Sequence, residues 1–95
     1  MGGGGPGPDV MGQIREAIKK ATTYPPSARR RRIEGSVLAG FYINGEGRPE
    51  GIRVIRSSGH EVLDRAVVRI IERASPFPPV RAHVEVPVSF KLLVE

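Results

Sequence analysis

Apolar residues recur along this chain with two different periods. Over residues 10–22 and 60–74 they return every three or four positions, which is the spacing of one face of a helix. Over residues 35–44, 50–57 and 83–94 they alternate with other residues, as in a strand with one buried face. This order predicts an α+β domain in which a three-stranded antiparallel sheet carries the helices on one face.

The two predicted helices have clear apolar faces and clear ends. Asp9 is a candidate N-cap for the first helix, and Pro25 ends it because proline disfavours helix in the residue before it. Ser57 and Ser58 offer capping hydroxyls to the second helix, and residues 27–32 allow one further helical turn. The apolar positions are Val10, Met11, Ile14, Ala17, Ile18 and Ala21 in the first helix and Leu63, Ala66, Val67, Ile70, Ile71 and Ala74 in the second.

The first two strands form a predicted hairpin. The sequence NGEG at residues 44–47 joins them, and Asn and Gly accept the positive φ that tight turns require. Ile52 and Val54 of the second strand are expected to point inward. The residues of the first strand expected on its core face are Val37, Ala39, Phe41 and Ile43.

The last strand contains a proline, Pro87, in the middle of its alternating pattern. Proline has no N–H to donate, so a sheet tolerates it on an edge strand where that position faces away from the neighbour. The last strand is therefore predicted at an edge, with strand 35–44 in the centre, and its outer backbone row is open to a partner. The direction of the backbone N–H and C=O groups alternates along a strand. The residues whose backbone groups point outward are therefore Glu85, Pro87, Ser89, Lys91 and Leu93. The residues whose side chains point into the core are Val84, Val86, Val88, Phe90, Leu92 and Val94.

Composition limits the class of protein further. The 95 residues suffice for one small domain with a mainly aliphatic core, since 39% are hydrophobic and only 5% aromatic. The chain has no cysteine, which excludes disulfides, thiolate catalysis and cysteine-bound zinc. Residues 1–9 are rich in Gly and Pro and are expected to form a flexible linker or tail, which leaves residues 10–95 as the domain.

Candidate catalytic and metal-binding patterns are weak. HEVLD at residues 60–64 has His and Glu at the spacing of a zinc-protease motif, but Asp64 stands where a second His is needed. Ser57, Ser58, His60 and Asp64 are triad residue types, yet close neighbours in sequence seldom converge around an oxyanion site. We therefore expect no enzyme activity and no cofactor or metal.

The net charge of +5 is concentrated in four consecutive arginines, Arg29–Arg32, and favours an acidic partner. Three interpretations stay open: a solvated basic surface, a surface that steers an acidic protein, and a nucleic-acid contact. Proteins that read RNA usually interleave aromatic and basic residues, and Tyr24 is the only aromatic residue near this run. A nucleic-acid partner is therefore not expected.

Five segments of the chain resemble, in order and spacing, the C-terminal domain of TonB proteins from Tyr24 to about Val94. The segments are YPPSARRRRIEGSV, FYINGEGRPEGIRVIRSSG, VLDRAVVRII, PFPP and VEVPVSF. The resemblance implies a three-stranded antiparallel sheet with helices on one face, which agrees with the pattern above. The run of four arginines is more basic than this stretch usually is in the family.

The resemblance also implies a function. A TonB protein is anchored in the inner membrane, crosses the periplasm, and couples the proton-motive force, through the ExbB–ExbD complex, to uptake of substrates such as siderophores and vitamin B12. Its C-terminal domain binds the TonB box, an extended peptide of outer-membrane transporters, as a strand beside its last strand. This chain would then be the periplasmic domain, with the anchor and the ExbB–ExbD contact in a missing N-terminal part. The partner-binding residues implied here are Tyr24, Pro25, Val84, Glu85, Val86, Pro87, Val88, Ser89, Phe90, Lys91 and Leu92.

Two other functions are kept as alternatives. A scaffold domain of the TolA type has a similar periplasmic sheet-and-helix fold with a different partner, and a basic nucleic-acid-binding module would use Arg29–Arg32. A homodimer through paired edge strands also remains open.

Overall fold

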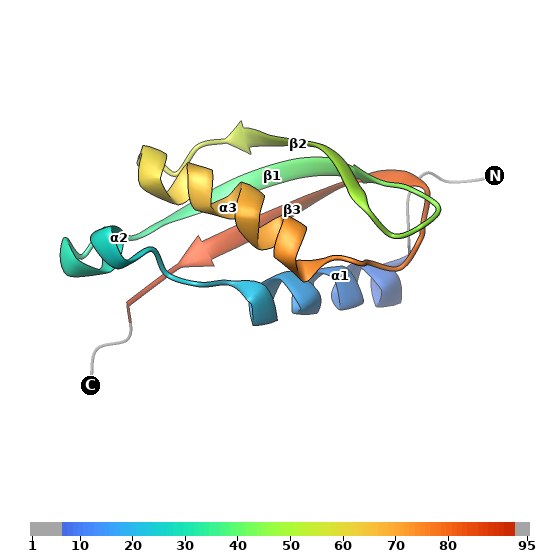
Figure 1. Cartoon of the computed structure of the whole chain (residues 1–95), viewed down its shortest axis with the longest axis horizontal. Helices are drawn as coiled ribbons and strands as arrows, with labels where there is room; N and C mark the ends of the chain where they lie inside the picture. The colour runs from blue at the N-terminus through green and yellow to red at the C-terminus, as the bar shows by residue number, and fades with distance from the viewer. Residues whose placement is uncertain (1–6, 93–95) are drawn as a thin grey trace.

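The computed structural model describes residues 7–92 of the chain (Figure 1). The flexible linker expected over residues 1–9 is wrong for Pro8 and Asp9, which lie in the first helix. Residues 1–6 of that linker and the expected strand positions of Leu93 and Val94 lie outside the described residues. The predicted α+β class is confirmed. The elements in chain order are α1 (Pro8–Ala21), α2 (Pro26–Arg30), β1 (Gly35–Ile43), β2 (Pro49–Arg56), α3 (Glu61–Ala74) and β3 (Ala82–Phe90).

The three strands form one antiparallel sheet in the order β2-β1-β3, so the prediction of a central first strand is confirmed. β3 pairs with β1 without interruption, from Gly35 opposite Phe90 to Ile43 opposite Ala82. The helices α1 and α3 pack against each other; α3 also packs against β1 and β2, whereas α1 packs against β3 (Figure 1). This arrangement places α1 next to the outer side of the last strand.

The core lies between the sheet and the helices, and both predicted apolar faces contribute to it. The alternation of β1 and β3 is confirmed, because every second side chain is buried from Val37 to Ile43 and from Val84 to Phe90. The buried side chains are Ile14, Ile18, Ala28, Val37, Ala39, Phe41, Ile43, Leu63, Val67, Ile70, Ile71, Phe77, Val84, Val86, Val88 and Phe90.

β2 departs from the simple alternation that its sequence suggests. Its pairing with β1 shifts register twice, between Leu38 and Ala39 and between Gly40 and Tyr42. Ile52 is half-buried as expected, but Val54, which was expected to point inward, keeps 36% of its surface exposed. Val54 pairs with Ala39, a residue of the buried face, so its side chain lies on the core side of the sheet and is partly exposed because β2 is an edge strand. The register shifts add unpaired residues, so a strict period of two does not hold over the whole of β2.

The N-terminal ends of both long helices differ from the sequence-based expectation. α1 begins at Pro8 with Gly7 as its N-cap, so Asp9 lies in the first turn, where its charge favours the positive end of the helix dipole. The N-cap of α3 is His60, without a capping side chain. The expected capping serines bind the side chain of Asp64 instead: Ser57 Oγ donates to it, and Ser58 N and Oγ donate at 3.0 and 2.7 Å.

β3 is shorter than the predicted strand 83–94. Its pairing ends at Phe90 because the opposite strand begins at Gly35, so no residue of β1 remains to pair with Lys91 or Leu92. The N–H of Leu92 donates instead to Glu34 Oε2 at 2.8 Å. The side chain just before β1 thus takes over where the strand pairing stops.

Phe77 closes one end of the core. Its ring lies 5.5 Å from the ring of Phe41, and its N–H donates to the carbonyl of Gly47 at 2.7 Å. Gly47 has φ +79°, and a Cβ there would come within 2.2 Å of the Phe77 carbonyl oxygen. Glycine is therefore required where the hairpin turn meets the segment that leads into β3.

Candidate functional site

Within residues 7–92, β3 pairs with β1 alone, so its other edge is free. Pro87 lies opposite Leu38 and cannot donate to it, which fits a position whose backbone groups face away from β1. The N–H of Leu92 points toward the β1 side, where it donates to Glu34. This is the direction expected for an even-numbered residue, because backbone groups point alternately to the two sides of a strand. The open edge predicted from Pro87 is thus present in the structure.

The nine residues of β3 divide into a buried row and an exposed row. The side chains of Val84, Val86, Val88 and Phe90 are buried in the core, so their main role is to support the strand. Val88 is the one among them that also lines the groove described below. The odd-numbered residues are the ones whose backbone groups are directed at the free edge. Within this row, Glu85, Pro87 and Ser89 of β3 and Lys91 beyond it are exposed.

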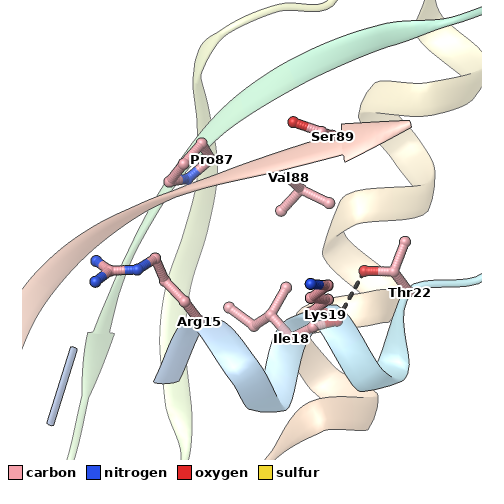
Figure 2. Close-up of a pocket in the computed structure, with 7 residues that line it drawn as sticks. All are labelled: Arg15, Ile18, Lys19, Thr22, Pro87, Val88 and Ser89. Carbon is pink, nitrogen blue, oxygen red and sulfur yellow. Dashed lines mark hydrogen bonds between the residues drawn. The ribbon is translucent and has the colours of Figure 1, made fainter. Parts of the chain in front are cut away.

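A groove of about 420 Å³ runs between the free edge of β3 and α1. In Figure 2, Ile18 and Val88 approach each other from the helix and the strand, while Arg15 and Lys19 stand on the helix beside them. Thr22 closes the far end of the helix wall, and its hydroxyl donates to the Ile18 carbonyl at 2.7 Å. The full lining is Arg15, Ile18, Lys19, Thr22, Pro87, Val88 and Ser89.

The helix wall of this groove was missed by the sequence analysis. The pattern of α1 shows that Ile18 is buried and that Arg15 and Lys19 lie one turn apart beside it. It does not show which strand the helix packs against, because that depends on the order of strands and on the path of the chain between them. The spacing of the two basic residues was the available signal, and it became meaningful only with the fold.

Tyr24 and Pro25, both expected to bind a partner, occupy different surroundings. The Tyr24 ring packs edge-on against Phe90 at 5.6 Å between centroids, and its hydroxyl donates to the carbonyl of Ile33. Desolvation, and secondarily the charge of Glu34, raise the pKa of Tyr24. Tyr24 therefore lies at the C-terminal end of β3. Pro25 contacts the α3 side of the molecule instead, in a shallow pocket with Val62 and Arg69.

The residues that resembled catalytic or metal-binding patterns have structural roles. Partial desolvation acts to raise the pKa of Asp64, but hydrogen bonds from Ser57 and Ser58, with the nearby His60, outweigh it and lower the pKa. The same hydrogen bonds hold the turn between β2 and α3. Among residues 7–92 there is no group of three or more His, Cys, Asp or Glu side chains arranged to hold a metal ion.

The four consecutive arginines are exposed at and after α2. Arg32 has φ +56°, in the left-handed region that ends this short helical segment. No helix in the part of the chain that the structure describes has both the length and the apolar character needed to cross a bilayer.

Comparisons with known proteins agree with this geometry. Protein TonB of Helicobacter pylori strain J99 is 32% identical over 87 residues, covering 88% of this chain and 31% of the relative. Protein tonB2 of Pseudomonas aeruginosa is 41% identical over 78 residues, covering 76% of this chain and 29% of that protein. The chain therefore spans about a third of the length of these relatives.

The fold comparison points to the same proteins. The solution structure of the Helicobacter pylori TonB C-terminal domain superposes with a TM-score of 0.83 at 31% identity, over 96% of this chain and 88% of that one. The family model described as Gram-negative bacterial TonB protein C-terminal matches residues 20–92, which include α2, α3 and all three strands. The chain thus belongs to the family of TonB C-terminal domains.

Proposed function

We propose that this domain binds an extended peptide of an outer-membrane transporter, the TonB box, as a fourth strand along the free edge of β3. The observation that carries this proposal is the regularity of that edge. β3 has no register shift over nine paired residues, so its outward N–H and C=O groups are evenly placed to receive another strand.

The wider role follows from the family. We propose that the domain works in the periplasm as the non-enzymatic end of a longer protein anchored in the inner membrane. The part of that protein outside this chain would contact the ExbB–ExbD complex and receive work derived from the proton-motive force. The domain would pass this work to transporters for substrates such as siderophores or vitamin B12. A ladder of main-chain hydrogen bonds suits this task, because it shares a pulling load among several bonds and depends little on the peptide's sequence.

A proline substitution at residue 89 tests strand addition directly. Ser89→Pro removes one outward N–H, and Pro87 shows that β3 accepts proline in this row. We expect it to weaken binding of a synthetic TonB-box peptide about three- to tenfold, since one hydrogen bond contributes about 0.5–1.5 kcal/mol. The melting temperature should change little.

The matched control is Ser89→Ala, which removes the hydroxyl and keeps the N–H. It should bind the peptide like the parent chain, as measured by calorimetric titration. A variant pair in which the alanine change weakens binding and the proline change does not would exclude strand addition on this edge. Self-association through β3 would appear instead as a concentration-dependent mass in sedimentation that the peptide abolishes.

Tyr24 and Pro25 are proposed to act by shaping the ends of the site. Tyr24 packs on Phe90, the last residue of β3, so it fixes where the free edge stops. Pro25 is the N-cap of α2 and directs the chain away from β3 after α1. Tyr24→Ala is expected to weaken peptide binding without global unfolding, and parallel losses of stability and affinity would reduce Tyr24 to a core residue.

A further inference from the structure

The groove beside β3 has one basic wall. Arg15 and Lys19 are both exposed, and both line the groove. Within residues 7–92 the only ion pair joins Arg65 and Glu61, so neither groove cation is neutralised by an acidic side chain there. Lys20, the next residue along, lies on the other side of α1 near Asp9 and Glu16. The side of α1 that faces β3 therefore carries positive charge without a partner.

An added strand would lie over this wall. Neighbouring strands are about 4.8 Å apart, and α1 is the helix that packs against β3, so the fourth strand would run above the α1 residues of the groove. Side chains alternate along a strand, so every second peptide side chain would point toward α1. The remaining peptide side chains would lie on the open face of the sheet, beside Glu85 and Ser89.

The two rows of the peptide would thus meet different surroundings. At the centre of the groove, Ile18 and Val88 form an apolar contact between helix and strand, which favours an aliphatic peptide side chain (Figure 2). Arg15 and Lys19 flank this contact one helical turn apart. An acidic side chain two residues from the aliphatic one lies in the row that faces the helix, where it would meet the positive charge of Arg15 or Lys19. An acidic side chain in the other row would face away from both.

We propose that α1 is the second wall of the peptide site, and that Arg15 and Lys19 select peptides with a carboxylate in the row of side chains that faces this helix. The inference rests on the proposed strand addition to β3 and adds to it a rule for which peptides bind best. Main-chain pairing supplies affinity for extended peptides in general, and the basic wall discriminates among them.

The experiment uses the full chain and a capped nine-residue peptide of alternating serine and valine. The alternation fixes which row of side chains faces the helix, because a slip by one residue would move every valine off the apolar contact. Each position in turn is replaced by Glu and, in a second set, by Gln. Affinity is measured by titration of the isotope-labelled protein, following its amide chemical shifts, and the ratio of the Gln to the Glu dissociation constant isolates the effect of charge.

For the parent chain we expect this ratio to be about 1.5 to five at valine positions near the groove at low salt, since exposed ion pairs contribute about 0.2–1 kcal/mol. At serine positions it should be near one, which gives a pattern with a period of two residues. In Arg15→Gln/Lys19→Gln the ratio should fall to about one throughout, and any change in the affinity for the unsubstituted peptide cancels in this ratio. Because both side chains are exposed, thermal unfolding of this variant should match that of the parent.

The matched control is Lys20→Gln/Arg30→Gln, which removes the same net charge from exposed positions outside the groove. It should keep the parent's period-two pattern. A ratio that is equal at all positions, or that falls equally in both double variants, would overturn the inference and leave only general attraction to a basic domain. If the unsubstituted peptide shifts no amide of β3, strand addition itself fails and the inference fails with it.

Discussion

The sheet has two edge strands, and they differ in the regularity of their pairing and in the apolar side chains that they expose. β3 is regular over nine residues, and its buried and exposed side chains alternate strictly. β2 shifts register twice, contains Gly51 at φ +62°, and leaves Val54 and Ile55 exposed by 36% and 40%. Arg53 and Arg56 add charge to β2. β2 is thus protected against edge pairing in the way natural sheets usually are, whereas β3 is regular and its edge is blunted mainly at Pro87, which lacks an N–H.

The difference shows that an edge position alone does not make a docking site. Register shifts bend a strand and break the even spacing of its free N–H and C=O groups, whereas a regular strand keeps them in line. The two strands also differ in what lies beside them, because α1 forms a groove with β3. The two strands are alike in one respect, because a carboxylate accepts a backbone N–H just after each of them. Asp64 accepts from Ser58 after β2, and Glu34 accepts from Leu92 after β3.

The largest expected effect is the loss of stability when a buried side chain of β3 is removed, compared with removal of an exposed side chain of β2. Phe90→Ala should lower the free energy of unfolding by about 3–5 kcal/mol, because it empties a fully buried site on β3 and removes the contact with Tyr24. Ile55→Ala on β2 should cost about 1 kcal/mol or less, because that side chain is 40% exposed. Chemical denaturation of both variants measures the difference, and similar losses would contradict the assigned registers.

A smaller effect tests the irregularity of β2. Gly51→Ala places a side chain at φ +62° and should destabilise the domain by about 1–2 kcal/mol, since L-residues avoid the left-handed region. Gly12→Ala is the control: this glycine lies within α1, a Cβ there would meet nothing within 4 Å, and the change should stabilise by about 0.5–1 kcal/mol. Equal thermal shifts in the two variants would show that β2 does not need glycine at this point.

The smallest expected effect is the pH dependence of the end of β2. The pKa of Asp64 is lowered in the folded state, so its hydrogen bonds stabilise the fold above the ordinary carboxyl pKa of 3.8 and this contribution is lost as pH falls through the lower, folded-state value. Asp64→Asn should remove that part of the acid dependence while leaving stability at higher pH below that of the parent. Parallel curves of unfolding free energy against pH would show that Asp64 contributes nothing specific.

Much of the fold could be predicted from the sequence because hydrophobic period and turn residues agree with each other. The strict alternation of β3 and the missing N–H of Pro87 were sufficient to predict both its buried face and its place at the edge. β2 was less predictable, since its register shifts arise from pairing with β1 and leave no fixed period in the sequence. The capping of α3 was also misjudged, because the helix begins at Glu61 with His60 as its N-cap. Ser57 and Ser58 lie before the cap position, and their hydroxyls donate to Asp64.

The candidate site was predicted only on its strand side. Glu85, Ser89 and Lys91 followed from the parity of a single strand, which is local information. Arg15, Ile18 and Lys19 are more than sixty residues away in the chain and reach β3 only through the packing of α1. A groove between distant elements has no signature within either element, so it required the structure.

The most direct test of strand addition to β3 is amide hydrogen exchange of the full chain with and without a saturating TonB-box peptide. If the peptide adds to the free edge of β3, the amides of Glu85, Ser89 and Lys91 should gain protection. The amides of Val84, Val86 and Val88 should change little because they already bond to β1, and those of β2 should not change. Protection gained along β2, or gained without the alternation along β3, would contradict the claim that the regular edge is the binding site.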